Sequence, residues 1–345
     1  MAQNRVVVVG CGGISRAWFP PLIAENVEVC AAVDLNTEVA KTRLAAHPEL
    51  ANTEVSDNFK KMLKRHKPQF VLDLTVPEAH CEVTCTALRA GCHVIGEKPM
   101  AASMTQARKM VKTAEETGNM YMVSQSRRWD RFNDACRLTV NSGELGELNT
   151  INCDFYLAPR FGGFRDEMDS PLILDMSIHH FDLIRFMSGK DPVSVYAHEY
   201  NPKGSWYKGD VAASCIFEMS DGVMFNYRGS WCADGCWTSW HGDWRYIGDK
   251  GTMIYNVDKM PFGQVRSAPY GSETDKPHHQ PLKDLPVTDS PMPFSGFHGG
   301  LREMLAFLNE GKRPQTECHD NIKSLAMVFA AIESSKKGRR VEVKI

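Results

Sequence analysis

The sequence predicts an α/β domain with a doubly wound parallel sheet, then an α+β domain with a large, open and mainly antiparallel sheet. The first 125 residues alternate strand-like and helix-like segments, an order typical of a parallel sheet covered by helices on both faces. Between residues 193 and 256, strand-like segments follow one another without helices, which indicates antiparallel pairing. We therefore expect domains at 1–125 and 126–345, and an arrangement in which the closing helices pack back on the first domain is compatible with this division.

In the first domain, apolar runs bounded by turn residues predict the elements. Strands are expected at residues 5–10, 27–34, 69–74, 93–96 and 120–124, and helices at 15–24, 37–46, 78–90 and 103–117. Pro20 and Pro21 are expected to interrupt the first helix, because proline lacks a backbone donor and its ring clashes with the preceding turn.

In the second domain, the pattern begins with a helix at 132–141 and a strand at 148–156, separated by glycine turns. The loop APRFGGFRDEM then leads to an apolar helix at 172–187. Further strands are expected at 193–199, 211–218, 223–231 and 245–256, with turns at SDG and GDKG. Residues 257–295 predict a long loop or arm, and two helices near 300–309 and 320–337 close the chain.

The composition is that of a globular protein. Of its 345 residues, 43% are hydrophobic and 24% charged, and the net charge of −2 gives no reason to expect nucleic acid or a membrane as partner. Neither a signal-peptide core nor a run of eighteen apolar residues is present, so we expect a cytoplasmic protein. Two pairs of cysteines lie four residues apart without a second pair at zinc-ribbon spacing, so no metal is expected.

The stretch VVVVGCGGIS places Gly10, Gly12 and Ser15 at the positions of a G-x-G-x-x-G motif between a strand and a helix. In such a turn the backbone approaches a pyrophosphate bound at the helix N-terminus. Asp34 ends the second strand 24 residues after Gly10, where an acid binds the ribose hydroxyls. Asp34 would repel a 2′-phosphate and no arginine follows it directly, so NAD is favoured over NADP. The alternative is an ordinary glycine turn and strand-end aspartate.

The segment LILDMSIHHFDLIRFM carries Asp175, His179 and Asp182 on one stripe of a helix at about 100° per residue. The helix is apolar nearly all round and therefore buried, so these groups either are paired or line a reactive cavity. Asp182 is expected to pair structurally. His180 lies off the stripe and is expected to be a packing or polar-contact histidine.

A second candidate stretch is HVIGEKPMA, in which Glu97 and Lys98 follow a strand at the carboxyl edge of the sheet. Open α/β sheets bind ligands at this edge, where a lysine can donate to a substrate hydroxyl. The alternative is an exposed loop lysine.

In this order and spacing, the glycine turn, Glu-Lys-Pro and the later Asp-x-x-x-His-x-x-Asp resemble the glucose–fructose oxidoreductase/inositol dehydrogenase (Gfo/Idh/MocA) family over essentially the whole chain. The resemblance implies a Rossmann domain and an NAD(P)-dependent sugar or polyol dehydrogenase whose catalytic group is Lys98, Asp175 and His179. It also implies a homodimer or homotetramer built on the open sheet.

The cofactor contacts expected from the motif and the resemblance are Gly10, Gly12, Gly13, Ile14, Asp34, Thr75, Pro77, His80, Glu97, Lys98, Gln125 and Arg128. The chain departs from the family pattern at Pro77, where asparagine is common, and at Trp129, where phenylalanine is usual. Ser170-Pro171 replaces a glycine pair before the catalytic helix, so the substrate pocket is expected to be unusual.

The chemistry of alcohol oxidation fits these residues. His179 is the expected general base because its ordinary pKa of about 6.5 lies near working pH. Lys98 would stabilise developing alkoxide charge, and Asp175 would bind a neighbouring hydroxyl. Further expected substrate contacts are Arg128, Arg160, Arg165 and Trp237. The alternative for Arg160 and Arg165 is a solvated surface loop. The alternative for the four clustered tryptophans is packing in the sheet or in a subunit interface; they are Trp231, Trp237, Trp240 and Trp244.

The sequence thus predicts an NAD-dependent oxidoreductase that oxidises a secondary hydroxyl of a sugar, glycoside or cyclitol to a ketone. A first alternative is an enzyme with tightly bound NAD that cleaves or rearranges a glycoside through transient oxidation. A second is a non-catalytic dinucleotide-binding sensor, and a zinc dehydrogenase is disfavoured because no cysteine–histidine set has ligand spacing.

Overall fold

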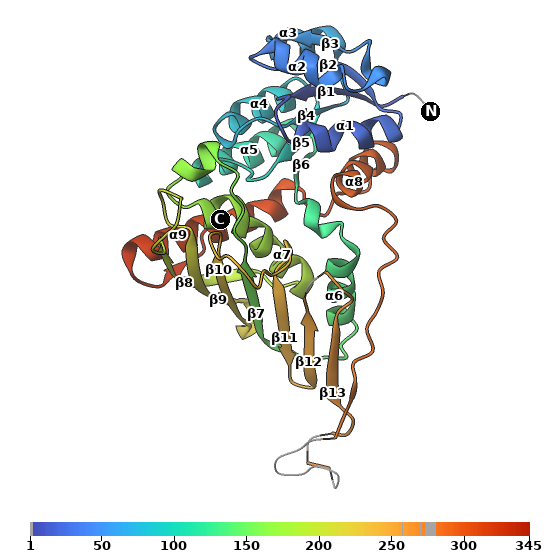
Figure 1. Cartoon of the computed structure of the whole chain (residues 1–345). Coiled ribbons are helices and arrows are strands. Elements are labelled where there is room, and N and C mark those ends of the chain that lie inside the picture. Colours follow the sequence, from blue (N-terminus) through green and yellow to red (C-terminus); the bar gives the residue numbers. More distant parts are fainter. Residues whose placement is uncertain (1–2, 257, 270, 273–280) are drawn as a thin grey trace. The chain divides into compact units, whose positions relative to one another are not determined.

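A computed structural model of the protein describes residues 3–256, 258–269, 271–272 and 281–345 (Figure 1). The chain forms two units. Unit 1 comprises Met1–Trp129, Phe294–Leu325 and Ile345, and unit 2 comprises Asp130–Pro293 and Ala326–Lys344. None of the helices in the described residues is both long and apolar enough to cross a membrane.

Unit 1 is built on a six-stranded parallel sheet with the order β3-β2-β1-β4-β5-β6. This order is that of a doubly wound nucleotide-binding fold, so the predicted class of the first domain is confirmed. Apart from the partly exposed β3, the strands are almost entirely buried, in keeping with their continuous apolar runs. Their bounds are β1 (Arg5–Val9), β2 (Glu28–Val33), β3 (Glu54–Ser56), β4 (Phe70–Asp73), β5 (His93–Glu97) and β6 (Tyr121–Ser124).

The helices of unit 1 cover this sheet, and Figure 1 shows α4 beside α5 and α1 beside α8. Three of them begin at a side-chain cap: Asn36, Asn58 and Ser103 each accept a hydrogen bond from a backbone N–H of the first turn. The helices are α1 (Ser15–Ala24), α2 (Thr37–Leu44), α3 (Phe59–His66), α4 (Pro77–Arg89), α5 (Met104–Thr117) and α8 (Gly296–Glu310), together with the start of α9 (Cys318–Lys337).

One prediction about unit 1 is wrong. Helix α1 is continuous through Pro20 and Pro21 rather than interrupted by them. Trp18 and Phe19 are fully buried on this helix, and their packing outweighs the backbone hydrogen bonds that the prolines remove. Two short elements, β3 and α3, were also not predicted.

Unit 2 contains a nine-stranded sheet with the order β14-β13-β12-β11-β7-β10-β9-β8-β15. Its neighbours are antiparallel except β7 and β10, which pair in parallel, so the sheet is mixed and mainly antiparallel as predicted. The strands are β7 (Leu148–Tyr156), β8 (Pro192–Tyr200), β9 (Ala212–Met219), β10 (Met224–Ser230), β11 (Asp243–Gly248), β12 (Gly251–Tyr255), β13 (Phe262–Arg266), β14 (Leu282–Asp284) and β15 (Val341–Glu342).

The predicted loop at 257–295 is partly wrong, because β13 and β14 lie within it. A Cβ on Gly263 would lie 2.2 Å from the carbonyl oxygen of Thr252, so glycine permits the close pairing of β13 with β12. Residues 257, 270 and 273–280 of this predicted loop lie outside the described residues.

The apolar segment at 172–187 is helical, but its first part is not an α-helix. Residues Leu172–Ser177 form a π-helical segment, and α7 (Ile178–Ser188) follows it directly. The predicted stripe at 100° per residue is therefore wrong for Asp175, since a π-helix closes i to i+5 hydrogen bonds. Such widened turns are frequent at functional sites. Helix α6 (Arg131–Asn141) packs against α7.

A buried carboxyl group lies near the end of β8. Glu199 is 6% exposed, and its Oε2 accepts a hydrogen bond of 3.3 Å from the hydroxyl of Ser170, just before the π-helical segment. Its Oε1 has no hydrogen-bond partner among the described residues. Burial raises the pKa of Glu199 from 4.5 to about 7; the Ser170 hydrogen bond opposes this rise and the charge of Asp210 adds to it.

Because the folded chain favours protonated Glu199, the free energy of unfolding is expected to fall as pH rises from 4.5 to about 7. This contribution is on the order of 3 kcal/mol. Glu199→Gln keeps the group neutral, so denaturant unfolding between pH 5 and 8 should show a smaller loss of stability in this variant. The exposed Glu147→Gln should behave like the wild type; equal slopes for all three chains would contradict the prediction.

Candidate active site

The predicted nucleotide-binding turn of unit 1 lies directly after β1. Gly10 has a φ of +90°, and a Cβ there would lie 2.7 Å from the carbonyl group of Leu74, so only glycine fits. Gly12 and Gly13 differ, since a Cβ on either would meet no atom within 4 Å. The turn is therefore anchored at Gly10 and open above Gly12 and Gly13, where a pyrophosphate needs room.

The N-terminus of α1 directly follows this turn. Ile14 occupies the N-cap position, no side chain caps the helix and no acidic residue lies in its first turn. The buried hydroxyl of Ser15 donates 2.7 Å to the carbonyl oxygen of Gly12, which explains why serine fits the third motif position. The helix dipole at this N-terminus favours a bound phosphate.

Asp34 lies beside the same turn, as expected. One carboxylate oxygen accepts 2.8 Å from the backbone N–H of Cys11, and the other accepts 2.9 Å from that of Asn36. Sequence reasoning missed Arg43, whose Nε donates 3.3 Å to the carbonyl oxygen of Cys11. Arg43 lies on α2, so only the folded chain brings its guanidinium to the turn.

Glu97 and Lys98 lie where β5 ends. The Glu97 carboxylate is buried; it accepts 2.8 Å from the indole Nε1 of Trp18 and 3.2 Å from the backbone N–H of Lys98. Burial raises the pKa of Glu97 above its ordinary value, and the indole hydrogen bond opposes this rise. Trp18, another residue missed from the sequence, thus fixes Glu97 and with it the backbone that carries the half-buried Lys98.

A buried histidine lies on α4, whose first residue is Pro77. The Nδ1 of His80 lies 3.1 Å from Asp73 and 3.2 Å from the hydroxyl of Thr75, and Thr84 also donates to Asp73. Burial opposes the charged imidazole, but the carboxylate of Asp73 outweighs it and raises the pKa of His80. The buried Nε2 has no hydrogen-bond partner among the described residues, so it is the ring atom available to a ligand.

Gln125 and Arg128 follow β6. Gln125 is 1% exposed, and neither atom of its amide group has a hydrogen-bond partner in the described part of the chain. A buried amide without partners is costly, which fits a ligand contact there. Arg128 donates 2.7 Å to Asp320 and 3.1 Å to the carbonyl oxygen of Gln315, so its guanidinium ties this loop to the start of α9. Its predicted ligand contact stays a prediction.

In unit 2, the structure brings two predicted residues together. The Nε of Arg165, in the 3-10 helix Gly163–Glu167, donates 2.6 Å to the carboxylate of Asp175 in the π-helical segment. The guanidinium also lies over the rings of Phe161 and Phe164, 5.3 and 4.6 Å from their centroids. The arginine loop is thereby attached to the predicted catalytic helix.

His179 lies in the first turn of α7 and is 9% exposed, as is Asp175. The neighbouring His180 is fully buried, and its ring lies 4.6 Å from that of Phe155 and 5.5 Å from that of Tyr227. His180 therefore packs among aromatic rings, in keeping with the packing or polar-contact role expected for it, and His179 is slightly more exposed.

The remaining predicted substrate residues are exposed. Arg160 pairs with Asp234 at 3.2 Å and lies over the ring of Trp206 at 4.1 Å, which fits the solvated-loop alternative. The tryptophan cluster divides into two classes. Trp231 and Trp244 are buried in the unit 2 core. Trp237 is 61% exposed and Trp240 is 44% exposed.

Two glycine-to-alanine variants test the glycine turn, one at Gly10 and one at Gly13. Gly10→Ala should lower the free energy of unfolding by about 1–3 kcal/mol, because a Cβ would be strained at positive φ and would overlap β4's end. Gly13→Ala should leave stability nearly unchanged and weaken NAD binding, because its Cβ enters the open space. Denaturant unfolding and NAD titration of both variants check this; the opposite pattern would contradict the assignment of that space.

Comparison with known proteins places these features in a family. Residues 4–125 match an oxidoreductase family with an NAD-binding Rossmann fold, and residues 133–254 match the GFO/IDH/MocA C-terminal domain. The chain is 26% identical over 363 residues to D-apiose dehydrogenase of Paraburkholderia graminis, covering 98% of this chain and 89% of that one. It is 25% identical over 351 residues to 1,5-anhydro-D-fructose reductase of Ensifer adhaerens, covering 99% of each.

The fold is shared with solved structures. A crystal structure of an oxidoreductase from Agrobacterium radiobacter, in complex with NAD+, L-tartaric acid and magnesium, superposes with a TM-score of 0.83 at 20% identity and covers 99% of both chains. Together with the glycine turn and its open phosphate space, these matches confirm the resemblance and the expected cofactor. The chain belongs to the GFO/IDH/MocA family of oxidoreductases, and its first domain is an NAD-binding Rossmann domain.

Proposed function

We propose that the protein oxidises a secondary hydroxyl of a sugar, glycoside or cyclitol to a ketone, with NAD as the hydride acceptor. The observation that carries the proposal is the pairing of Arg165 with Asp175, one turn before the partly accessible His179 on an otherwise apolar helix. In the proposal, Asp175 binds and His179 deprotonates a polyhydroxylated ligand, and both lie on a largely apolar, buried helical segment. The relatives named as a D-apiose dehydrogenase and a 1,5-anhydro-D-fructose reductase support a sugar as substrate.

In the proposed reaction, His179 accepts the hydroxyl proton at a ring nitrogen while the ammonium group of Lys98 stabilises the developing alkoxide. Bound NAD supplies the hydride acceptor for the C–H bond that breaks. Asp175, held by Arg165, accepts a hydrogen bond from the neighbouring hydroxyl and so orients the ring of the substrate. The proposal requires Lys98 and His179 to contact one substrate oxygen.

Residues of unit 1 fit the cofactor. Gly12 and Gly13 leave space for the pyrophosphate, and Asp34 is oriented at the same turn for the ribose hydroxyls. Gln125 and the Nε2 of His80 are buried polar groups suited to the nicotinamide end. Glu97 and Asp73 act as positioning residues, since each fixes a neighbour that would contact the cofactor or substrate.

Two variants test the catalytic roles. Lys98→Ala and His179→Ala should each lower kcat for NADH formation on the best substrate by about 10²–10⁴, with unchanged unfolding curves. The controls are Lys109→Ala and His198→Gln, both at exposed positions, and should keep full activity. Sugars, glycosides and inositols are screened by NADH absorbance.

The alternatives give distinct outcomes in the same assay. Product formation without net reduction of added NAD would indicate a tightly bound cofactor and transient oxidation. A chain that binds NAD, turns over none of the substrates and is unaffected by Lys98→Ala in its physiological role would be a sensor. Full activity in either alanine variant would overturn the assigned roles.

Cofactor choice is tested at Asp34. Asp34→Asn removes the negative charge and keeps an acceptor for the backbone of Cys11, so KM for NAD should rise about tenfold. Activity with NADP should rise, because Arg43 lies near the turn and the negative charge that would repel a 2′-phosphate is gone. Adding Arg43→Ala should remove the gained NADP activity while changing the KM for NAD little; an unchanged NAD/NADP ratio in Asp34→Asn would contradict the role of Asp34.

A further inference from the structure

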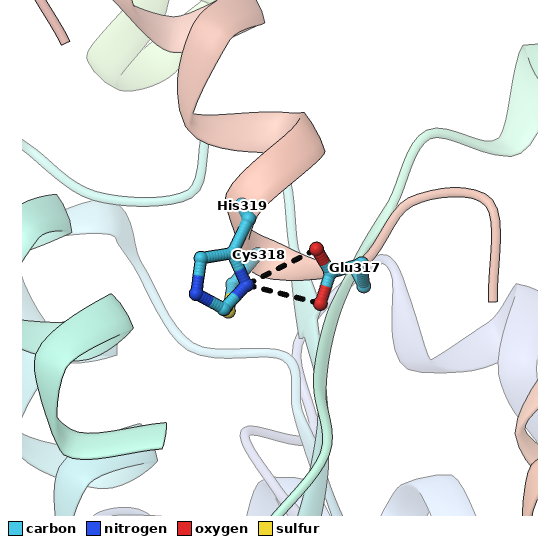
Figure 2. Close-up of side chains that lie close together, drawn as sticks. All are labelled: Glu317, Cys318 and His319. Carbon is cyan, nitrogen blue, oxygen red and sulfur yellow. Dashed lines mark hydrogen bonds and ion pairs between the residues drawn. The ribbon is translucent and has the colours of Figure 1, made fainter. Parts of the chain in front are cut away.

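Three side chains with different metal-binding chemistry gather at the start of α9, within unit 1. They are Glu317, Cys318 and His319, and Figure 2 shows both Glu317 oxygens facing one ring nitrogen of His319. Their backbone is held against β6, because the N–H of Val123 donates 3.0 Å to the carbonyl oxygen of Thr316. The cluster is therefore built on the edge of the sheet rather than on a loop tip.

The distances within the cluster are those of ligands around one ion. The Nδ1 of His319 lies 3.1 Å from each oxygen of Glu317 and 3.7 Å from the Sγ of Cys318, and one ligand atom from each residue falls within 4.8 Å of the others. Tetrahedral zinc bonds to nitrogen, oxygen and sulfur place N and O about 3.4 Å apart and N and S about 3.6 Å apart. The distances from His319 Nδ1 to Glu317 and Cys318 are close to these values.

Glu115 is placed to accept a hydrogen bond from the ring nitrogen of His319 that would not bind the metal, as carboxylates do beside zinc-bound histidines. The Nε2 of His319, on the far side of the ring, lies 3.0 Å from a carboxylate oxygen of Glu115 on α5. A carboxylate in this position fixes the tautomer and orientation of the ring, leaving Nδ1 to bind the metal. Glu115 and His319 are about half exposed, so the cluster is reachable from solvent although Cys318 is buried.

The competing explanation is an imidazolium held between two carboxylates with no metal. It accounts for the contacts of Glu115 and Glu317, and the guanidinium of Arg313, 3.4 Å from Glu317, would balance part of the charge. It does not require a thiol beside the same ring nitrogen. A cysteine sulfur, an imidazole and a carboxylate together are a donor set that zinc binds.

We propose that Cys318 Sγ, His319 Nδ1 and the Glu317 carboxylate bind one zinc ion, with Glu115 as the outer-sphere partner of His319 and water as the fourth ligand. The site lies at the start of α9, where Asp320 and the carbonyl oxygen of Gln315 hold Arg128. Bound zinc would fix this start of the helix. The proposal does not depend on the reaction assigned to the protein.

The direct test uses the full chain, stripped with a chelator and titrated with Co²⁺ as a spectroscopic substitute for zinc. One equivalent of Co²⁺ should give a thiolate-to-cobalt charge-transfer band and the intense visible bands of tetrahedral cobalt, and one equivalent of Zn²⁺ should remove both. His319→Gln and Cys318→Ser should each lose the charge-transfer band. The control Cys236→Ser, at an exposed cysteine, should keep it.

Thermal unfolding supplies a second readout that needs no activity. Zinc at about 100-fold its Kd should raise the Tm of the wild type and of Cys236→Ser by several degrees, and should not shift that of His319→Gln. Because His319 is half exposed, this variant is expected to fold even if Cys318→Ser does not. Absence of the charge-transfer band, or Co²⁺ and Zn²⁺ binding that His319→Gln leaves unchanged, would overturn the proposal and leave the metal-free ion pair as the explanation.

Discussion

The burial of polar side chains against apolar elements is the constraint on which the candidate site depends. A charged group moved out of water needs a partner, and each buried acid of the site has one in its own unit: Arg165 for Asp175, the indole of Trp18 for Glu97 and the imidazole of His80 for Asp73. These partners fix the orientation of the acids before any ligand arrives. Within each unit these acids are therefore held in place, and polar groups without a hydrogen-bond partner among the described residues, such as the Gln125 amide, fit a ligand contact.

Local sequence patterns predicted what depends on local structure. The glycine turn, the strands of unit 1 other than β3 and the helix that carries His179 each follow from residues within one short segment. Gly10 shows why, since its φ of +90° is a property of one residue. His180 and His179 differ in exposure because the two lie about 100° apart on an α-helix. The family resemblance rested on these same short segments.

Features that depend on distant residues could not be predicted in the same way. The parallel pairing of β7 with β10 joins segments about 70 residues apart. Strand β14 is entirely exposed, so its sequence has no burial pattern from which a strand could be predicted. The contacts of Trp18 with Glu97 and of Arg43 with the glycine turn likewise arise only in the folded chain. The π-helical turn that carries Asp175 was missed because an apolar run shows no sign of a change in helical period.

The proposed reaction requires Lys98 and His179 to act on one substrate oxygen. A double-mutant cycle with Lys98→Ala, His179→Ala and the double variant tests it, with kcat/KM for NADH formation as the measurement. Residues that stabilise one transition state together are not additive, so the double variant should lose little more activity than the worse single variant. Losses that multiply, as for two residues in separate sites, would contradict the account.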